Sequence, residues 1–264
     1  MFPVKDNIPT DRFPIVTVAI IVANVIVYFF LQRHVGSGLS GLNHVSDANT
    51  VKWGAIPYEF THPGKECALA ANAGQVVCQG EAGVSGTPPA QPPFYVTAFS
   101  AMFMHGGLLH IGGNMLFLWI FGNNIEDAMG RARFIIFYLL GGLAALALQI
   151  AVDPTSTVPT LGASGAIAAV LGGYILLYPR ARVLTVVFII LFFTIIEIPA
   201  MVVLGFWFVL QVLDGAGTFF NPSANGGGGV AYFAHIGGFA FGLLTIRLFA
   251  QRVKQVPRSR FPVY

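Results

Sequence analysis

Long apolar runs separated by short polar segments dominate the hydropathy pattern of this chain. A helix needs about 20 mostly apolar residues to cross a bilayer whose hydrocarbon core is about 30 Å thick. Six stretches reach or approach that length, and they predict an all-α membrane protein with six transmembrane helices. The predicted spans are residues 14–32, a segment within 94–125, 134–152, 162–178, a segment within 183–213, and 231–246.

The composition supports a lipid environment for this chain. Of its 264 residues, 55% are hydrophobic and 9% are charged, whereas soluble globular proteins contain about 25% charged residues. These values exclude an ordinary soluble enzyme, a disordered chain and a disulfide-dense secreted scaffold. A sequence pI near 9.0 would suit nucleic acid, but the basic residues lie beside the apolar runs. We therefore expect the lipid bilayer as a partner and no nucleic acid.

The basic residues fall mainly on one side of the predicted bundle. The two tails and the connections after the second and fourth spans hold 11 of the 14 Lys and Arg residues. Cytoplasmic loops carry the excess of Lys and Arg, so both termini are predicted to be cytoplasmic. We expect tails at residues 1–13 and 251–264 around a membrane domain at 14–250. The short tails without a targeting peptide favour a bacterial inner (plasma) membrane.

The segment 33–93 is predicted to be a long loop on the outer side. It contains the only two cysteines of the chain, Cys67 and Cys78. Because that side is oxidising, a disulfide between them is one reading, and two unpaired thiols are the other. The sequence alone leaves both readings open.

Four polar residues share one depth in the predicted bundle. His110, Asn114, Ser164 and His235 all lie near the N-terminal end of an even-numbered span. Even-numbered spans begin at the outer face, so all four fall in the outer half of the membrane. Polar residues inside spans are costly and are functional candidates by default.

Ser164 lies in the sequence Gly-Ala-Ser-Gly at the start of the fourth span. One interpretation is a helix N-cap, a position that serine favours. The other is a nucleophile, because the flanking glycines let a substrate backbone approach closely. In addition, the N–H groups and dipole at a helix N-terminus stabilise a developing oxyanion.

His235 is followed on the same helix face by Gly238 and Gly242. A Gly-x-x-x-Gly pattern lets membrane helices pack closely. Such packing is what a hydrogen bond of about 2.6–3.2 Å between a serine on one helix and a histidine on another requires. The alternative is that these glycines serve packing alone and that His235 is a structural hydrogen-bonding residue.

His110 and Asn114 are four residues apart and stack on one helix face. Both donate hydrogen bonds and suit an oxyanion, although they equally suit bonds between helices. The absence of an H-E-x-x-H sequence argues against a zinc protease. Glu197 is the only acid well inside a predicted span, so a paired-carboxylate mechanism lacks its second acid. We therefore expect a Ser–His dyad with no metal and no cofactor.

Four short segments, taken in order, resemble the rhomboid family of intramembrane serine proteases. They are HGGLLHIGGN at 105–114, GNNIE at 122–126, GASGA at 162–166 and AHIGGFAFG at 234–242. The resemblance covers roughly residues 95 to 250 and implies a rhomboid-like six-helix bundle. It also implies Ser164 as nucleophile and His235 as general base, with His110, Asn114 and the Ser164 backbone N–H binding the oxyanion.

The sequence departs from the family pattern in two places. Many bacterial members have a tyrosine one turn after the serine, stacked on the catalytic histidine, whereas this chain has Ala168. Many members also have a Trp-Arg pair in the first loop, but no Arg or Lys occurs between Lys65 and Arg131. Either another group therefore orients His235 or the imidazole is held more loosely, and the loop is anchored differently.

The sequence thus predicts a serine endopeptidase that cleaves transmembrane protein substrates in or near the membrane. Glu197 and Pro199, which we place in the fifth span, are candidates for gating lateral substrate entry, although Glu197 equally suits a hydrogen bond inside the bundle. Two other classes remain open: a non-enzymatic membrane protein that binds clients, and a small-solute channel. The sequence makes no prediction about the oligomeric state.

Overall fold

The computed structural model describes residues 2–32, 46–70, 75–84, 91–189, 192–220 and 230–254. Parts of the predicted loop 33–93 and of the tail 251–264 therefore lie outside the described residues. The fold is mostly helical, with two small sheets, so the all-α prediction is correct only in its main feature. The helices are α1 (Ile15–Ile26, continued by a π-helical segment Val27–Gln32), α2 (Asp47–Trp53), α3 (Pro57–Thr61), α4 (Phe94–Ser100), α5 (Leu108–Phe117), α6 (Asn123–Met129), α7 (Arg131–Val152), α8 (Ser164–Leu177), α9 (Ala200–Phe220) and α10 (Tyr232–Phe249). The strands are β1 (Phe2–Asp6), β2 (Cys67–Leu69), β3 (Val76–Cys78), β4 (Arg182–Ile189) and β5 (Phe192–Pro199).

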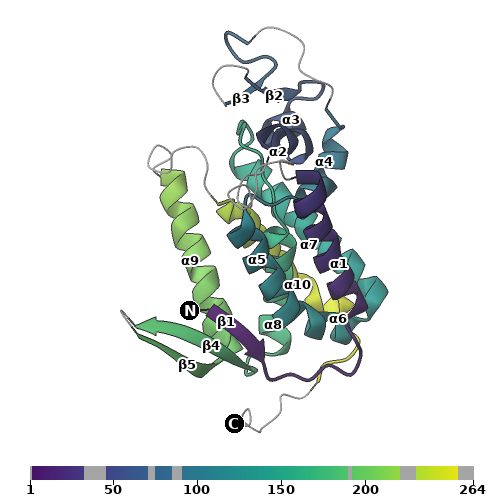
Figure 1. Ribbon diagram of the computed structural model, residues 1–264, viewed down its shortest axis with the longest axis vertical. Coiled ribbons are helices and arrows are strands. Elements are labelled where there is room, and N and C mark those ends of the chain that lie inside the picture. Colours follow the sequence, from purple (N-terminus) through teal and green to yellow (C-terminus); the bar gives the residue numbers. More distant parts are fainter. Residues whose placement is uncertain are drawn as a thin grey trace.

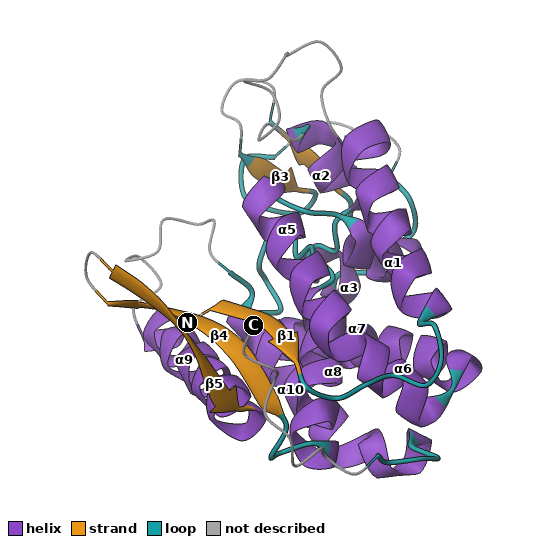
Figure 2. Ribbon diagram, turned by 60° about the horizontal axis from the view of Figure 1, so that its bottom comes forward, coloured by secondary structure: helices purple, strands orange, loops and turns teal. Residues whose placement is uncertain are grey.

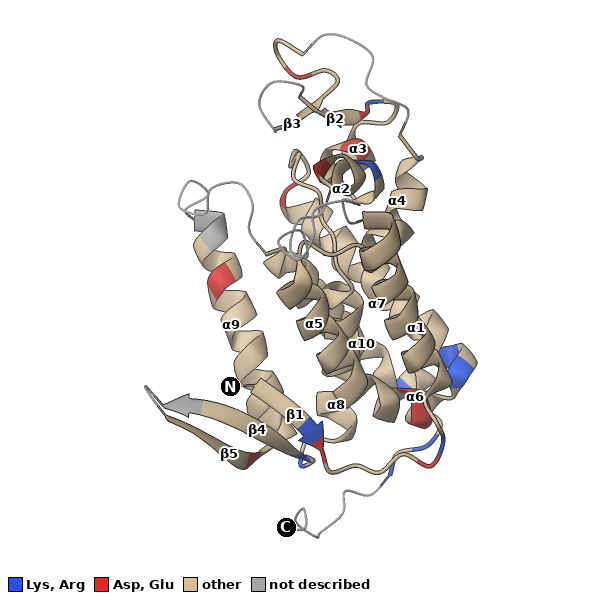
Figure 3. Ribbon diagram, viewed as in Figure 1, with Lys and Arg blue, Asp and Glu red and all other residues tan. Residues whose placement is uncertain are grey.

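Several of these helices are suited to a bilayer. Among the described residues, four are long and apolar enough to cross a membrane: Ile15–Gln32, Arg131–Val152, Ala200–Gly217 and Tyr232–Phe249. A bent pair of helices, Phe94–Phe103 and Leu108–Met129, raises this number to five if it counts as one span. Charged residues gather at the ends of the bundle and are sparse along the helices between them (Figure 3). The protein is therefore a multi-pass membrane protein.

The α8 helix lies at the centre of the bundle, beside α7 and α10 (Figure 1). Its residues 165–174 are all buried. Small residues make this possible, because a Cβ added to Gly238 would collide with the carbonyl oxygen of Gly165, and one added to Gly242 with that of Ala169. The predicted packing glycines thus lie where α10 and α8 backbones meet.

The expected span within residues 94–125 is interrupted rather than continuous. The α4 helix and the following short 3₁₀ turn end at Phe103, and a new helix begins at Leu108 at an angle of 82°. The break is fixed by Gln32, whose side chain accepts a hydrogen bond from the His105 N–H (2.8 Å) and donates one to the His105 carbonyl oxygen (2.7 Å). The end of the first span is therefore tied to the break in the second.

The fifth span was predicted within residues 183–213, but the N-terminal part of that segment is not helical. Residues 182–189 and 192–199 form the antiparallel strands β4 and β5, and the helix α9 begins only at Ala200. An apolar run rich in β-branched residues suits a strand as well as a helix, and hydropathy alone does not separate them. Glu197 lies on β5 and forms an ion pair with Arg182 across the hairpin (3.1 Å). The reasons for assigning a gating role to Glu197 and Pro199, an acid and a kink inside a span, therefore do not hold.

The three-stranded sheet has the order β1-β4-β5 and lies across one end of the bundle, which we call the sheet end (Figure 2). In it, β1 pairs antiparallel with β4, from Phe2 opposite Val186 to Asp6 opposite Val183. Residues expected in an N-terminal tail thus form part of the folded structure. The opposite end, which carries α2, α3, β2 and β3, we call the disulfide end (Figure 1).

At the sheet end, the buried Asp6 ties β1 to two helices of the bundle. Its carboxylate accepts hydrogen bonds from the Asn124 side chain on α6 (2.6 Å) and from the Tyr174 hydroxyl on α8 (2.5 Å). Because α8 carries Ser164 at its other end, this contact supports the position of the central helix.

Asp6 also makes the stability dependent on pH. Burial raises the pKa of Asp6 from 3.8 to about 7, although the Tyr174 hydroxyl opposes the shift. The stability that Asp6 contributes is thus fully present below about pH 4 and is lost as the pH rises through 7. We expect the free energy of unfolding to fall by on the order of a few kcal/mol between pH 5 and pH 8, which lowers the thermal midpoint measured in detergent. The variant Asp6→Asn should lose most of this pH dependence. An equal slope in both proteins would contradict this role.

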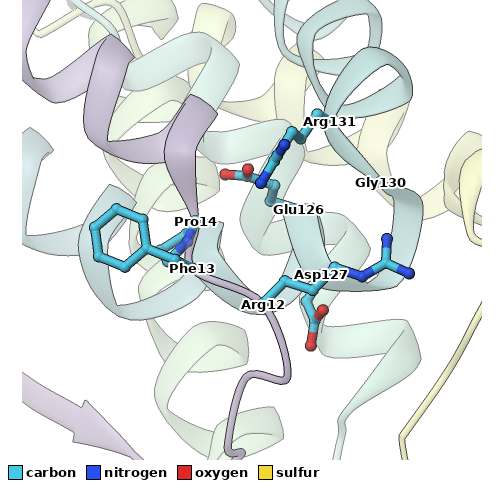
Figure 4. Close-up of a pocket in the computed structure, with 7 residues that line it drawn as sticks. All are labelled: Arg12, Phe13, Pro14, Glu126, Asp127, Gly130 and Arg131. Atoms are coloured by element: carbon cyan, nitrogen blue, oxygen red, sulfur yellow. The ribbon is translucent and has the colours of Figure 1, made fainter.

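A second carboxylate at the sheet end caps the first span. Glu126 on α6 accepts hydrogen bonds from the backbone N–H groups of Val16 (3.0 Å) and Thr17 (2.8 Å) and from the Thr17 hydroxyl (2.8 Å). These N–H groups have no partner within α1, because the first turn of a helix lacks acceptors. Figure 4 shows Glu126 beside Arg131 at a cavity of about 360 Å³, which Arg12 also lines. The acid of the segment 122–126 is therefore a structural cap.

At the disulfide end, the structure distinguishes between a disulfide and two unpaired thiols for the two cysteines. Cys67 and Cys78 are joined by a disulfide between β2 and β3. A further contact connects this end to the bundle, because Ala55 and Thr160 exchange backbone hydrogen bonds of 3.0 and 2.8 Å. The loop segment thereby holds the chain just before Ser164 in place.

Candidate active site

Ser164 is the first residue of α8, and its hydroxyl takes no part in capping that helix. The N-cap is Ala163, and no side chain makes a capping hydrogen bond there. Instead, the Ser164 Oγ lies 2.7 Å from Nε2 of His235. The structure thus favours the chemical interpretation of this serine over the capping one.

His235 lies in the first turn of α10 and is buried. Its Nδ1 is 2.6 Å from the side-chain oxygen of Gln211 on α9, and the Trp207 ring lies 5.6 Å away, centroid to centroid. An amide oxygen only accepts hydrogen bonds, so Nδ1 carries the proton of the neutral imidazole. The lone pair on Nε2 is then available to accept a hydrogen bond from the Ser164 hydroxyl.

His110 is the second histidine near Ser164. Its Nδ1 accepts a hydrogen bond from the Gly106 N–H (3.2 Å), so a neutral His110 carries its proton on Nε2. A Cβ added to Gly162 would lie 2.8 Å from His110 Nε2 and 3.4 Å from Ser164 Oγ. Both atoms therefore face one small space, which stays open because residue 162 is a glycine with φ +118°.

Asn114 lies one turn after His110 on α5, which packs beside α8. The side chain is buried, and its Nδ2 has no hydrogen-bond partner among the described residues. A buried donor without a partner costs about 1–3 kcal/mol. Such a donor suits a group that becomes bound only during a reaction.

The part of the chain that contains this site is similar to a known protein family. Residues 93–252 match the Rhomboid domain family. The chain belongs to the rhomboid family. The matched residues include α5, α8, α9 and α10, which supply the side chains of His110, Asn114, Ser164, Trp207, Gln211 and His235.

Individual rhomboid relatives resemble the chain over shorter stretches. Rhomboid protein 1, mitochondrial, of Saccharomyces cerevisiae is 30% identical over 155 residues, or 56% of this chain and 40% of the relative. Rhomboid protease GluP of Bacillus subtilis is 34% identical over 116 residues, or 43% and 21%. RHOMBOID-like protein 4 of Arabidopsis thaliana is 33% identical over 145 residues, or 55% and 32%. The matches thus cover less than half the length of each of these three relatives.

In this rhomboid family member, residues of α9 contact the His235 ring, and position 168 is an alanine rather than a tyrosine. Ala168 is fully buried on α8, where a Cβ added to Gly238 would lie 3.2 Å from it. A large ring has no room at that interface. Gln211 and Trp207 from α9 contact the imidazole instead.

The sequence analysis missed both of these residues. Gln211 is an uncharged polar residue that follows a run of apolar residues in α9, and the cost of polar groups in a membrane marks such a residue as a functional candidate. Trp207 precedes it by one helical turn, on the same face.

A small cavity of about 30 Å³ reaches Ser164. Small residues form much of its remaining wall, among them Gly142, Ala145, Ala231 and Ala234. The space admits about one water molecule. A group that approaches Ser164 from this side must therefore be small.

Proposed function

We propose that this protein is an intramembrane serine endopeptidase. It would hydrolyse peptide bonds in or near the transmembrane segments of membrane-protein substrates through a dyad of Ser164 and His235. The observation that carries the proposal is the 2.7 Å contact between Ser164 Oγ and His235 Nε2 inside a bundle of apolar helices. Membership of the rhomboid family and a relative named as a protease support it.

In the proposed acylation step, His235 Nε2 removes the hydroxyl proton while Ser164 Oγ attacks the scissile carbonyl carbon. The imidazolium then gives this proton to the leaving amine, and the C–N bond breaks to leave an acyl-enzyme. In the second step His235 removes a proton from water, which attacks the ester carbonyl. Collapse of this intermediate returns the proton to Ser164 and releases the new carboxyl end.

Three N–H donors would stabilise the oxyanion. They are His110 Nε2–H, Asn114 Nδ2–H and the backbone N–H of Ser164. The last belongs to the first turn of α8 and has no partner within the helix. Removal of one such donor typically costs about 2.7–4 kcal/mol of transition-state stabilisation.

The orientation in the membrane follows from the same proposal. Six helices would cross the bilayer: the four long ones, the segment Leu108–Met129 and the short α8. The 14 residues of α8 span roughly 21 Å, less than a core of about 30 Å. With the sheet end at the cytoplasmic face of a bacterial plasma membrane, Ser164 lies below the outer surface. Both termini are then cytoplasmic, in agreement with the distribution of basic residues.

Reconstitution in lipid vesicles tests the proposed function. The substrate is a single transmembrane segment with alanine and glycine residues near its outer end, and the product fragments are identified by mass. We expect cleavage in the outer half of the segment. Substrate that is bound but not cut would instead favour a client-binding protein. Solute flux through the vesicle membrane without cleavage would favour a channel. Either result would overturn the proposal.

A further inference from the structure

We propose that Gln211 is a positioning residue for His235 and that it replaces both the acidic triad member and the stacked tyrosine. This inference rests on the proposed function and extends it to a residue of α9. Its basis is the 2.6 Å contact between the Gln211 side-chain oxygen and His235 Nδ1.

The contact selects one tautomer of the imidazole. When the proton is on Nδ1, the imidazole donates a hydrogen bond to Gln211, and Nε2 is free to accept the Ser164 proton. With the proton on Nε2, the ring would itself donate to Ser164 and would be unable to act as a base. Both His235 and Gln211 are buried, so water does not readily substitute for the amide. A neutral amide thus takes the orienting place that a carboxylate occupies in a Ser-His-Asp triad.

The α9 helix that carries Gln211 packs on the bundle through one face. Phe208 stacks on Phe239 at 4.3 Å, centroid to centroid, and a Cβ added to Gly215 would lie 3.2 Å from the Tyr232 side chain. Other residues of α9 are exposed on the described structure, including Met201, Val202, Phe206, Val209 and Leu213. The general base is therefore aligned only while α9 is seated on α10.

The test uses Gln211→Met, which keeps the side-chain length and removes the strong acceptor. We expect kcat to fall about ten- to a hundred-fold with little change in KM, because the loss affects the chemical step rather than substrate binding. The rate at which a fluorophosphonate labels Ser164 should fall by a similar factor. Gln211→Glu restores an acceptor of equal length, so it should recover much of the lost kcat. The control is Leu210→Met, one residue away on the exposed face of α9.

The outcomes separate this inference from the proposed function. If the wild-type protein cleaves and Gln211→Met has unchanged kcat and labelling rate, the positioning role is wrong while the dyad stands. A loss that Gln211→Glu does not restore at all would indicate a purely structural role and would also overturn the inference. If the wild-type protein neither cleaves nor reacts with the probe, the proposed function itself fails.

A second and independent observation concerns the hairpin of β4 and β5. On β5, Phe192 is 80% exposed, Phe193 67%, Ile195 53% and Ile196 44%. Successive residues of a strand point to opposite faces, so apolar side chains are uncovered on both faces. In addition, β5 is an edge of the sheet, and an exposed apolar edge strand in water would promote aggregation.

We propose that this hairpin lies in the cytoplasmic interface of the bilayer. The strand continues into α9, whose exposed Met201 and Val202 belong to a membrane-span candidate, so the apolar surface of the hairpin adjoins a lipid-facing surface. The sheet lies across the end of the bundle rather than along the helices (Figures 1 and 2). The charged pair of Arg182 and Glu197 at its base suits the headgroup level.

A spin label on Phe193→Cys tests this location in vesicles. The two native cysteines form the disulfide, so the new thiol is the only one free to react. We expect the label to be more accessible to oxygen, which dissolves in the acyl region, than to a water-soluble nickel chelate. A label on Lys5→Cys of β1 provides the aqueous comparison. Equal chelate accessibility at both sites would place the hairpin in water, and protection of Phe193→Cys from both reagents would indicate cover by a second copy. Either result would contradict the proposal.

Discussion

Ser164→Ala is expected to abolish cleavage of a transmembrane substrate while the protein remains folded. Alanine removes the attacking oxygen and leaves His235 without its proton donor, and loss of a nucleophile costs about three orders of magnitude in kcat or more. The fold should persist because the Ser164 hydroxyl does not cap α8 and alanine favours helix formation. The measurement is kcat in vesicles, together with the thermal midpoint of each protein in detergent.

The matched control is Ser156→Ala. Ser156 lies in the loop before α8, where its hydroxyl accepts a hydrogen bond from the Val158 N–H at 3.4 Å and does not contact His235. This variant should cleave at nearly the wild-type rate. Substantial cleavage by Ser164→Ala would exclude the dyad, because a group other than the Ser164 hydroxyl would then have to be the nucleophile.

Gly242→Ala is expected to reduce cleavage at least about a hundred-fold. The added methyl group would collide with the carbonyl oxygen of Ala169, and a backbone atom has no rotamer by which to move aside. The α10 helix must then shift away from α8, which lengthens the hydrogen bond between Ser164 Oγ and His235 Nε2. A misplacement of about 1 Å at a reacting centre costs roughly a hundred-fold in rate.

The comparison for this variant is Gly205→Ala on α9, where an added Cβ meets nothing within 4 Å. It introduces the same methyl group into an apolar helix and should leave the rate nearly unchanged. Wild-type activity in Gly242→Ala would show that close approach of α8 and α10 is not required for the reaction.

Hydropathy predicted several helices well because a membrane helix must be long and apolar. The expected segments 14–32, 134–152 and 231–246 differ by a few residues from Ile15–Gln32, Arg131–Val152 and Tyr232–Phe249. The same signal failed over residues 183–199, where the run is equally apolar. There the outcome depends on pairing with β1 and on the ion pair of Arg182 with Glu197, which are contacts between segments that hydropathy does not describe.

The candidate site shows a similar division. Ser164 and His235 were identified from their motifs and their shared depth, and the structure brings them within hydrogen-bond distance. The sequence left two alternatives, another group that orients His235 or a more loosely held imidazole, and it did not identify Gln211. Gln211 is 24 residues distant in the chain from His235, and only the packing of α9 on α10 reveals the contact.

The most direct test of the central claim is labelling with a serine-directed fluorophosphonate, followed by peptide mapping. The probe requires a serine activated by a neighbouring base, and it needs no knowledge of the natural substrate. We predict a single adduct on Ser164 in the wild-type protein and almost none in folded His235→Ala. An adduct on a different residue, or equal labelling of Ser164 in the absence of His235, would contradict the account.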